Sequence, residues 1–231
     1  MGSLQEGLRQ FGTAVQIYLW SAQDSVDLHV LDRALDDKGN RQLLLRPNRP
    51  LQAGHEYELR ASRGQENVFY YFEQPPASTA KRKGLTRYRW KVATAIDWQA
   101  PIWKGSPQVL KKVYENNYDY YNIVLFSCPV RDSSTYLIKI TVRHQATGRQ
   151  WCAYQTPANR IPWKSQVWVG ESSCGGNVRF ELESDYSVVF EAIDSAGNRA
   201  SAGSAPLAFQ APKKVECCLK VRSQPSKLKK R

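Results

Sequence analysis

The sequence lacks most of the patterns that identify enzymes, zinc proteins and membrane spans. It has one Met and three His among 231 residues, and the His residues lie far apart, at positions 29, 55 and 144. No apolar run approaches the roughly 18 residues that a membrane-spanning helix requires. The chain contains no G-x-S-x-G nucleophile turn, no H-E-x-x-H zinc motif and no glycine-rich phosphate loop. We therefore expect no enzymatic activity, no metal or cofactor and no membrane span.

The five cysteines form no metal or redox motif either. They occupy positions 128, 152, 174, 217 and 218, and none makes the C-x-x-C spacing of a zinc or thioredoxin-type site. Cys152 and Cys174 flank one loop, so we expect a disulfide between them in an oxidising compartment, with Cys128 as the other candidate partner. The alternative is that these residues are small, buried apolar side chains.

Positive charge is in excess, but it is concentrated in two segments of the chain. The formal net charge is +12. Residues 213–231 contain eight Lys or Arg against one Glu, and residues 80–93 contain six Lys or Arg and no acid. Together these segments account for the whole excess, so the rest of the chain is close to neutral. A basic tail without aromatic residues is typical of a solvated segment rather than of a nucleic-acid-binding face. We do not expect nucleic acid as a partner.

What the sequence does contain is repeated alternation of apolar and polar residues, which is the pattern of half-buried β-strands. The segments VDLHVLD, YLIKITVR and YSVVFEAI each place apolar side chains at every second position. Turn residues separate these runs at short intervals, as in antiparallel sandwiches. Only residues 4–11 and 107–115 could form a short helical turn. The sequence therefore predicts an all-β fold.

A domain boundary is predicted where Asp97 and Pro101, within AIDWQAPIW, interrupt the strand pattern. The chain then divides into an N-terminal segment, a first domain with a long loop, a second domain and a flexible basic tail. The expected bounds are 1–11 for the segment, 12–97 for the first domain with its loop at 62–86, 98–212 for the second domain, and 213–231 for the tail.

Both predicted domains contain the order of residues that makes a tyrosine corner. Leu51 lies six positions before Tyr57 in PLQAGHEYELRA, and Phe180 lies six positions before Tyr186 in FELESDYSVVFEA. In a tyrosine corner the phenol packs inward and its hydroxyl bonds to backbone a few residues upstream. We therefore assign structural roles to Tyr57 and Tyr186.

These segments also carry a family resemblance. PLQAGHEYELRA resembles the L-x-P-G-x-x-Y-x-V segment of fibronectin type III and bacterial Ig-like domains, with Ala53 where Pro is usual. YSVVFEAIDSAGNRAS is similar to the last hairpin of such domains, and IDWQAPIW resembles the linker that begins the next module. The resemblance implies two tandem antiparallel β-sandwiches in a secreted, periplasmic or cell-surface protein. The first twelve residues contain no apolar core of the signal-peptide kind, so a cytoplasmic location is the alternative.

The segment EAIDSAGNRA, with a near-echo in LDDKGNR at 35–41, offers oxygen ligands that calcium prefers. It is not an EF-hand loop, because counting from Asp194 puts Gly at position four and Ala205 at position twelve. Gly and Asn adopt positive φ at low cost, and Asp caps its own backbone, so the same residues suit a hairpin turn. We predict that Asp194, Gly197 and Asn198 form a turn. A looser calcium site that uses Asp97 with Asp194 or Asp36 is the alternative.

Clustered aromatic residues are the remaining signal of function. They are concentrated in WCAYQTPANRIPWKSQVWVG and YENNYDYY. Exposed aromatic rings suit sugar stacking or a protein interface, because they bury a large area at low entropic cost. We predict that Tyr118, Tyr120, Tyr154 and Trp163 contact a ligand, and that Trp168 belongs to the core. Three acids at positions 181, 183 and 185 would share a strand face, where a solvated surface is a better interpretation than a catalytic carboxylate pair.

Taken together, these observations predict a non-enzymatic interaction, adhesion or spacer module whose partner is a protein or a glycan. Two alternatives remain open. One is a carbohydrate-binding accessory module that uses Tyr118, Tyr120 and Trp163. The other is a cytoplasmic factor whose basic strand, residues 81–91, and basic tail contact nucleic acid.

Overall fold

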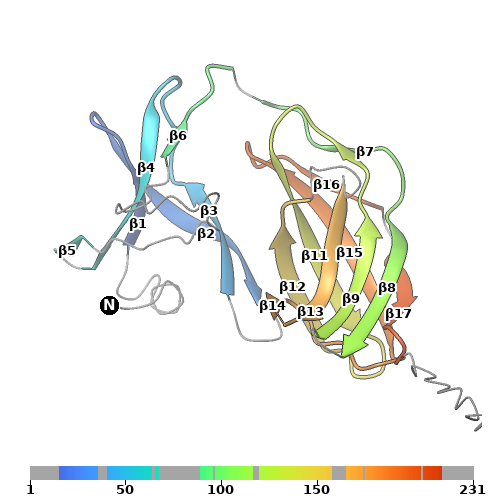
Figure 1. Cartoon of the computed structure of the whole chain (residues 1–231). Helices are drawn as coiled ribbons and strands as arrows, with labels where there is room; N and C mark the ends of the chain where they lie inside the picture. The colour runs from blue at the N-terminus through green and yellow to red at the C-terminus, as the bar shows by residue number, and fades with distance from the viewer. Residues whose placement is uncertain are drawn as a thin grey trace, which may run out of the picture.

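The structure, a computed structural model, describes residues 16–35, 41–63, 66–67, 89–95, 97–116, 120–157, 165–173, 175–203 and 205–214. These residues form antiparallel strands joined by turns, as Figure 1 shows, and none of them lies in a helix. The predicted all-β class is confirmed. Within these ranges, no helix is long and apolar enough to cross a membrane.

The N-terminal half, taken as the described residues between 16 and 95, forms one antiparallel sheet. Its strand order is β3-β2-β1-β4-β5, and β6 pairs with β4 as well. The strands are β1 (Gln16–Trp20), β2 (Ser25–Leu35), β3 (Arg41–Pro47), β4 (Glu56–Arg63), β5 (Glu66–Asn67) and β6 (Arg89–Lys91). Because the described residues of this half make a single sheet, the two-sheet sandwich expected for residues 12–97 stays a prediction.

Period-two alternation decides which face of this sheet is buried. Among the residues that the structure describes in this half, Leu19, Val26 and Tyr57 form a buried cluster. Leu19 stands opposite Val26 on β2 and opposite Leu59 on β4, so apolar side chains meet across three neighbouring strands. Asp27 and His29 alternate with the buried positions of β2 and are exposed, as the pattern predicts.

The C-terminal half, residues 97–214, contains two larger sheets. One has the order β12-β11-β15-β16, with β17 also paired to β15, and the other has the order β14-β13-β9-β8. A separate pair joins β7 (Ile102–Trp103) to β10 (Val130–Arg131). The strands of the two sheets are β8 (Gln108–Asn116), β9 (Tyr120–Ser127), β11 (Tyr136–His144), β12 (Gln150–Gln155), β13 (Gln166–Ser172), β14 (Gly175–Gly176), β15 (Asp185–Asp194), β16 (Arg199–Ser201) and β17 (Leu207–Gln210).

Apolar side chains of both sheets meet in one core, which makes this half a β-sandwich. Phe126 of β9 packs edge-on against Phe190 of β15 and Phe209 of β17, with ring centroids 5.3 and 5.2 Å apart. The alternating positions of β11 that were predicted to share a face are all buried: Ile138, Ile140 and Val142.

Each half contains a tyrosine whose hydroxyl bonds to backbone five residues upstream. The N–H of Gln52 donates to Tyr57 Oη over 3.3 Å, and the N–H of Glu181 donates to Tyr186 Oη over 2.9 Å. Both tyrosines are only 1% exposed. Inward packing with an upstream backbone bond is the geometry of a tyrosine corner.

Two local expectations about strands need correction. Residues 107–115, a possible helical turn from sequence, lie almost wholly in β8, where pairing with β9 overrides local propensity. Glu181 and Glu183 lie in a turn before β15, and Glu183 has a φ of 61°, so they do not share a strand face with Asp185. All three acids are exposed, as expected of a solvated surface.

The prediction that Trp168 belongs to the core is wrong. Val167 and Val169 take the inward positions of β13, with relative exposures of 1% and 0%, so the side chain between them points outward. Trp168 is 44% exposed. The alternation in QVWVG allowed either Trp168 or the two valines to face the core, and the structure buries the valines.

Candidate functional site

Strands β2 and β3 extend from the N-terminal half onto the C-terminal half. The first residues of β2 pair with β1, and from Leu28 onward the strand pairs with β3, with a β-bulge between Val30 and Asp32. This two-stranded extension, residues 32–35 and 41–44, lies against the sheet that contains β12 and β11 (Figure 1). We call it the docking arm. A β-bulge bends a strand and increases its twist, and this one lies where the docking arm begins.

The docking arm contacts the outer face of that sheet through apolar side chains. Ala34 of the arm, Tyr154 of β12 and Ile193 of β15 form a buried cluster with relative exposures of 1%, 8% and 2%. Leu44 and Cys152 pack against this cluster and are partly buried. The inner face of the same sheet faces the sandwich core, so β12 and β15 carry buried side chains on both faces.

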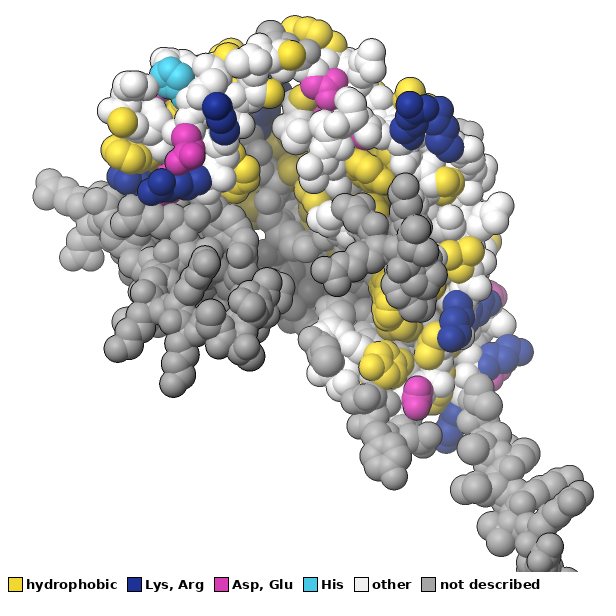
Figure 2. Space-filling model, turned by 45° about the horizontal axis from the view of Figure 1, so that its top comes forward, with side chains coloured by type: hydrophobic (Ala, Val, Ile, Leu, Met, Phe, Trp, Pro, Cys, Tyr) yellow, Lys and Arg dark blue, Asp and Glu magenta, His cyan; other side chains and the backbone are white. Residues whose placement is uncertain are grey.

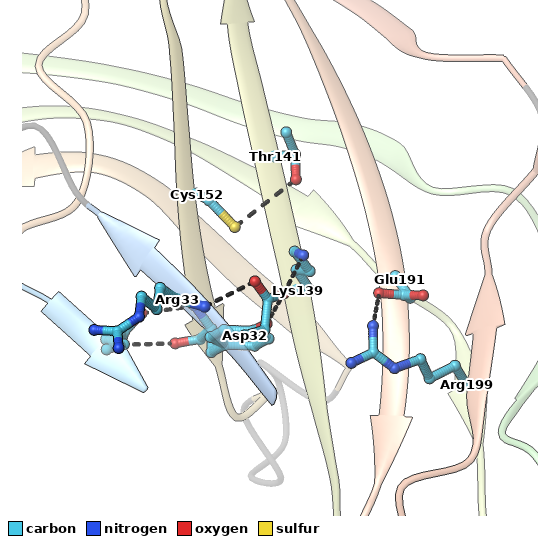
Figure 3. A network of polar contacts seen from close by, with 9 residues as sticks. Asp32, Arg33, Lys139, Thr141, Cys152, Glu191 and Arg199 are labelled. Carbon is cyan, nitrogen blue, oxygen red and sulfur yellow. Dashed lines mark hydrogen bonds and ion pairs between the residues drawn. The ribbon is translucent and has the colours of Figure 1, made fainter. Parts of the chain in front are cut away.

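A polar network beside this cluster joins the two halves. The Asp32 carboxylate of the arm forms an ion pair with Lys139 of β11 and accepts a hydrogen bond from the hydroxyl of Tyr154. Figure 3 shows Asp32 and Lys139 turned toward each other, with Cys152 and Thr141 on one side and the Glu191–Arg199 pair on the other. The Asp32 and Lys139 side chains are 26% and 23% exposed, so the pair is largely withdrawn from water.

The pKa values of this network follow from its geometry. Burial by itself would raise the pKa of Asp32, but the hydrogen bonds from Lys139 and Tyr154 outweigh it and hold that pKa below its usual value. Burial, with the bond to the Asp32 carboxylate, raises the pKa of Tyr154 above its usual range. Burial also raises the pKa of the Cys152 thiol. Asp32 is therefore an anion, and Tyr154 a neutral donor, across the physiological pH range.

Gln42 adds a second polar contact between the halves. Its side-chain amide donates to the carbonyl of Tyr154 over 3.1 Å and accepts the N–H of Tyr154 over 2.8 Å. The amide thus satisfies both backbone groups of one residue on β12, as a neighbouring strand would. Gln155 does the same for Trp168 of β13, with bonds of 2.5 and 3.1 Å.

The docking of the arm is expected to weaken in acid. A depressed pKa in the folded state means that Asp32 contributes stability above its unfolded pKa of about 3.9, and that this contribution is lost as pH falls through the lower folded value. Chemical shifts of Lys139 and Tyr154, followed by NMR between about pH 5 and pH 2, should report this loss. Asp32→Asn should remove the acid-dependent step while leaving the shifts of the remote sandwich core unchanged. An identical acid profile in that variant would contradict the assignment.

The first residues of the C-terminal half, among them Asp97 and Trp98, form the linker from the N-terminal half, and the turn of EAIDSAGNRA holds this linker. Asn198 donates from its side-chain amide to the carbonyl of Asp97 over 3.0 Å and to the Asp194 carboxylate over 2.8 Å. Asp194 in turn accepts the backbone N–H groups of Ala196 and Asn198, at 2.9 and 2.8 Å. Gly197 has a φ of 92°, which favours glycine. The segment is a turn, as predicted, and its Asn also bonds to the linker.

Three carboxylates gather at this end of the sandwich. Oxygen atoms of Asp97, Asp132 and Asp194 lie within 4.8 Å of one another. Among the residues that the structure describes, these three carboxylates are close enough together to hold a cation. Each carboxylate already accepts a backbone N–H in its own turn: from Gln99, from Ser134, and from Ala196 with Asn198. Their present bonds account for the arrangement as three neighbouring Asx turns. Asp36, the other residue considered for calcium, lies outside the described residues.

Two of the four predicted ligand-contacting residues, Tyr120 and Tyr154, lie among the described residues, and they belong to different sheets. Tyr154 lies under the docking arm. Tyr120 is half-buried on β9, where its hydroxyl donates to Glu171 over 2.8 Å, and burial together with this bond raises its pKa. Its ring packs edge-on against Tyr114, with centroids 6.3 Å apart. Tyr118 and Trp163 lie outside the described residues, so their role stays a prediction.

The cysteines have different environments. Cys128 is fully buried in the sandwich core as a free thiol, and burial raises its pKa to about 12. Cys152 is a free, partly buried thiol beside the docking arm, and the Thr141 hydroxyl lies 3.9 Å from its Sγ. Cys174 lies outside the described residues, as do Cys217 and Cys218, so the Cys152–Cys174 pairing stays a prediction.

Sequence reasoning missed the residues that join the two halves. Asp32, Gln42 and Lys139 occupy polar positions of alternating strands, where solvent exposure is the normal expectation. The available signal of a contact was Ala34, a small residue among the larger residues of LDRALDD. No protein-family model matches the chain, and no curated protein matches its sequence.

Proposed function

We propose that the chain is a non-enzymatic interaction or spacer module of a secreted or cell-surface protein, in which the two halves act as one stiff unit. The docking arm is the observation that carries this proposal. A flexible pair of domains needs no contact beyond its linker. Here an apolar cluster, an ion pair and a glutamine amide hold the halves together in addition to the linker. A stiff unit transmits position and force between what lies at its two ends.

The topology of the C-terminal half supports a relation to Ig-like or fibronectin type III domains. The strands β8, β9, β11, β12, β13, β15 and β17 can be lettered A, B, C, C′, E, F and G in chain order. The sheets are then A-B-E and C′-C-F-G, and Ig-type sandwiches divide A, B and E from C, F and G in this way. This architecture hosts many binding and structural roles, so it specifies no partner.

Exposed aromatic side chains favour an interaction role over a purely passive one. Trp98, in the linker, is 80% exposed, and Trp90 at the end of the N-terminal half is 48% exposed. Large exposed aromatics are enriched where proteins bind partners. On the face shown in Figure 2, the Lys and Arg side chains of the described residues lie in separate groups. The exposed tryptophans therefore favour a protein or a glycan as the proposed partner.

The proposal is tested by the motion of one half relative to the other. NMR relaxation should give both halves of the parent chain one common rotational correlation time. The double variant Asp32→Ala, Gln42→Ala should separate the two correlation times, since each bond to a charged group contributes about 1.5–3 kcal/mol and the amide bonds contribute about 1 kcal/mol each. Arg199→Ala is the matched control, because it removes an ion pair with Glu191, 3.2 Å long, that lies within the C-terminal half.

A parent chain whose halves tumble independently would contradict the proposal, as would a double variant that remains as stiff as the parent. Small-angle X-ray scattering provides a second readout. The radius of gyration should rise in the double variant and should stay at the parent value in Arg199→Ala.

A further inference from the structure

A pocket in the N-terminal half has the chemistry of a small-ligand site. Its volume is about 430 Å³, within the range of about 300–1,000 Å³ that ligand sites occupy. It lies between the turn after β1, residues 21–23, and Gly54 and His55 at the start of β4. Trp20 of β1, Glu56 and Glu58 of β4, and Arg89 of β6 complete its wall. The docking arm and the linker contribute no residue to it.

Strand register places the key side chains in one row. Trp20 stands opposite Glu58 on one side of β4, and Arg89 stands opposite Glu58 on the other. The three side chains therefore project from the same face of the sheet, at neighbouring positions. This is the polar face, opposite the one that carries the buried Leu19 and Tyr57. A tryptophan and a nearly buried carboxylate are unusual on such a face, and packing of the core does not require them.

The polar groups of the row are held in place by ion pairs. Glu58 is 5% exposed and is bonded by Arg60 Nε at 3.2 Å and by Arg89 Nε at 3.4 Å. Arg89 also pairs with Glu56 through Nη1, at 3.3 Å. The wall thus offers carboxylate acceptors and guanidinium donors in a fixed arrangement. Each of these carboxylates has a guanidinium partner, so the row attracts neither a simple anion nor a simple cation.

Trp20 supplies the apolar part of the wall. Its indole is 36% exposed, and the Arg60 guanidinium lies 3.6 Å from the ring centroid. Cation–π stacking fixes the ring against the same arginine that bonds Glu58. A rigid aromatic surface beside fixed donors and acceptors suits a ligand with an apolar C–H face and several hydroxyl groups.

We propose that this pocket binds a neutral saccharide, whose C–H face contacts Trp20 while its hydroxyl groups bond to Glu56, Glu58 and Arg89. Hydroxyl groups both donate and accept, so a polyol satisfies a wall that contains both carboxylates and a guanidinium. This inference goes beyond the proposed spacer role, since a spacer requires no small ligand. It also lies on different residues from Tyr118, Tyr120 and Trp163, for which sugar contact was predicted from sequence.

The test is isothermal titration calorimetry of the full chain with neutral hexoses, N-acetylhexosamines and their disaccharides. At least one should bind with a Kd of about 1 mM or tighter. Glucose, glucuronic acid and glucosamine share one ring and differ in charge, so they test the class directly. The anionic and the cationic sugar should each bind about tenfold more weakly than the neutral sugar of the same series. A charged sugar that binds more tightly than its neutral counterpart would overturn the proposal, and so would a panel without a neutral binder.

Variants locate the site. Trp20→Ala and Arg89→Gln should each weaken saccharide binding by about tenfold or more, while Trp20→Phe, which retains an aromatic ring, should keep most of the affinity. Trp98→Ala is the matched control, because Trp98 is 80% exposed and lies in the linker. Binding at parent strength by folded Arg89→Gln and Trp20→Ala would overturn the assignment. Should Trp20→Ala fail to fold, Arg89→Gln decides. None of these variants touches the docking arm, so failure here leaves the stiffness experiment unaffected.

Discussion

Tyr57→Ala is expected to unfold the N-terminal half while the C-terminal half stays folded. Among the described residues, the buried core around Tyr57 contains Leu19 and Val26, with partly buried neighbours. Removing a buried aromatic side chain costs about 3–5 kcal/mol, which is close to the whole stability of a small domain, about 5–15 kcal/mol. The change also removes the bonds of Tyr57 Oη to Asp24, at 3.0 Å, and to the N–H of Gln52.

The matched change in the other half is Tyr186→Ala. Tyr186 is equally buried, but it belongs to a core in which Phe180 and Phe209 pack against it at centroid distances of 4.9 and 5.8 Å. The lost free energy of unfolding is of similar size, but the core around Tyr186 is much larger among the described residues. The sandwich should therefore remain folded with a lower melting temperature. The conservative variants keep the rings. Tyr186→Phe should lose only about 1 kcal/mol, whereas Tyr57→Phe, which also loses the bond to the Asp24 carboxylate, should lose about 1.5–3 kcal/mol.

Two-dimensional NMR of each variant measures the outcome. In Tyr57→Ala, resonances of β1, β2 and β4 should collapse to unfolded positions while those of β11 and β15 stay dispersed. Shifts at Lys139 and Tyr154 should change because the docking arm leaves. Simultaneous collapse of both halves would contradict the prediction and would mean that the docking arm makes the chain one folding unit.

Local alternation predicted several strands and their buried faces correctly, because those depend on neighbouring positions of one strand; β8 and the face of Trp168 on β13 are the exceptions. Val26 and Leu28 on β2, and Ile138 and Ile140 on β11, alternate with polar residues, and a strand has only two faces to offer them. The tyrosine positions were equally readable, since Tyr57 and Tyr186 bond within their own segments. Interactions within one strand or one turn can therefore be predicted from a short stretch of sequence.

The contacts between the halves were not predictable in the same way. Tyr154 alternates out of the sandwich core, so an exposed ligand-binding ring was a reasonable hypothesis until the docking arm was seen to cover it. Asp32 and Lys139 are 107 positions apart, and nothing local indicates that they pair. Asn198 illustrates the same limit: its turn was predictable from Asp194 and Gly197, but its bond to the linker was not. The pocket row of Trp20, Glu58 and Arg89 likewise depends on strand register, which alternation alone does not specify.

Gly170→Ala is expected to destabilise the sandwich strongly, because this glycine combines a close backbone approach with a positive φ. A Cβ at this position would lie 2.1 Å from the carbonyl oxygen of Asn122 and 2.7 Å from the Cα of Ile123. Both are backbone atoms of β9, the central partner of β13, so no side-chain rotation relieves the contact. The φ of Gly170 is 133°, which adds backbone strain. Overpacking costs about 1–3 kcal/mol and such strain a further 1–3 kcal/mol.

Gly197→Ala is the control for strain without a clash. Gly197 has a φ of 92°, but a Cβ there meets nothing within 4 Å, so its cost should be about 1–2 kcal/mol. Chemical denaturation of the two variants separates the cost of the clash from the cost of the backbone strain. Gly170→Ala should lose at least twice as much free energy of unfolding as Gly197→Ala. Equal losses would mean that β13 can move away from β9. That outcome is hard to reconcile with the pairing of β13, which is in register with β9 from Gln166 to Ser172. On the other edge of β13, Asn177 bonds to both the N–H and the carbonyl of Gly170, at 3.1 and 3.0 Å. Gly170 is therefore held on both edges, and the sheet requires a residue without a side chain at this position.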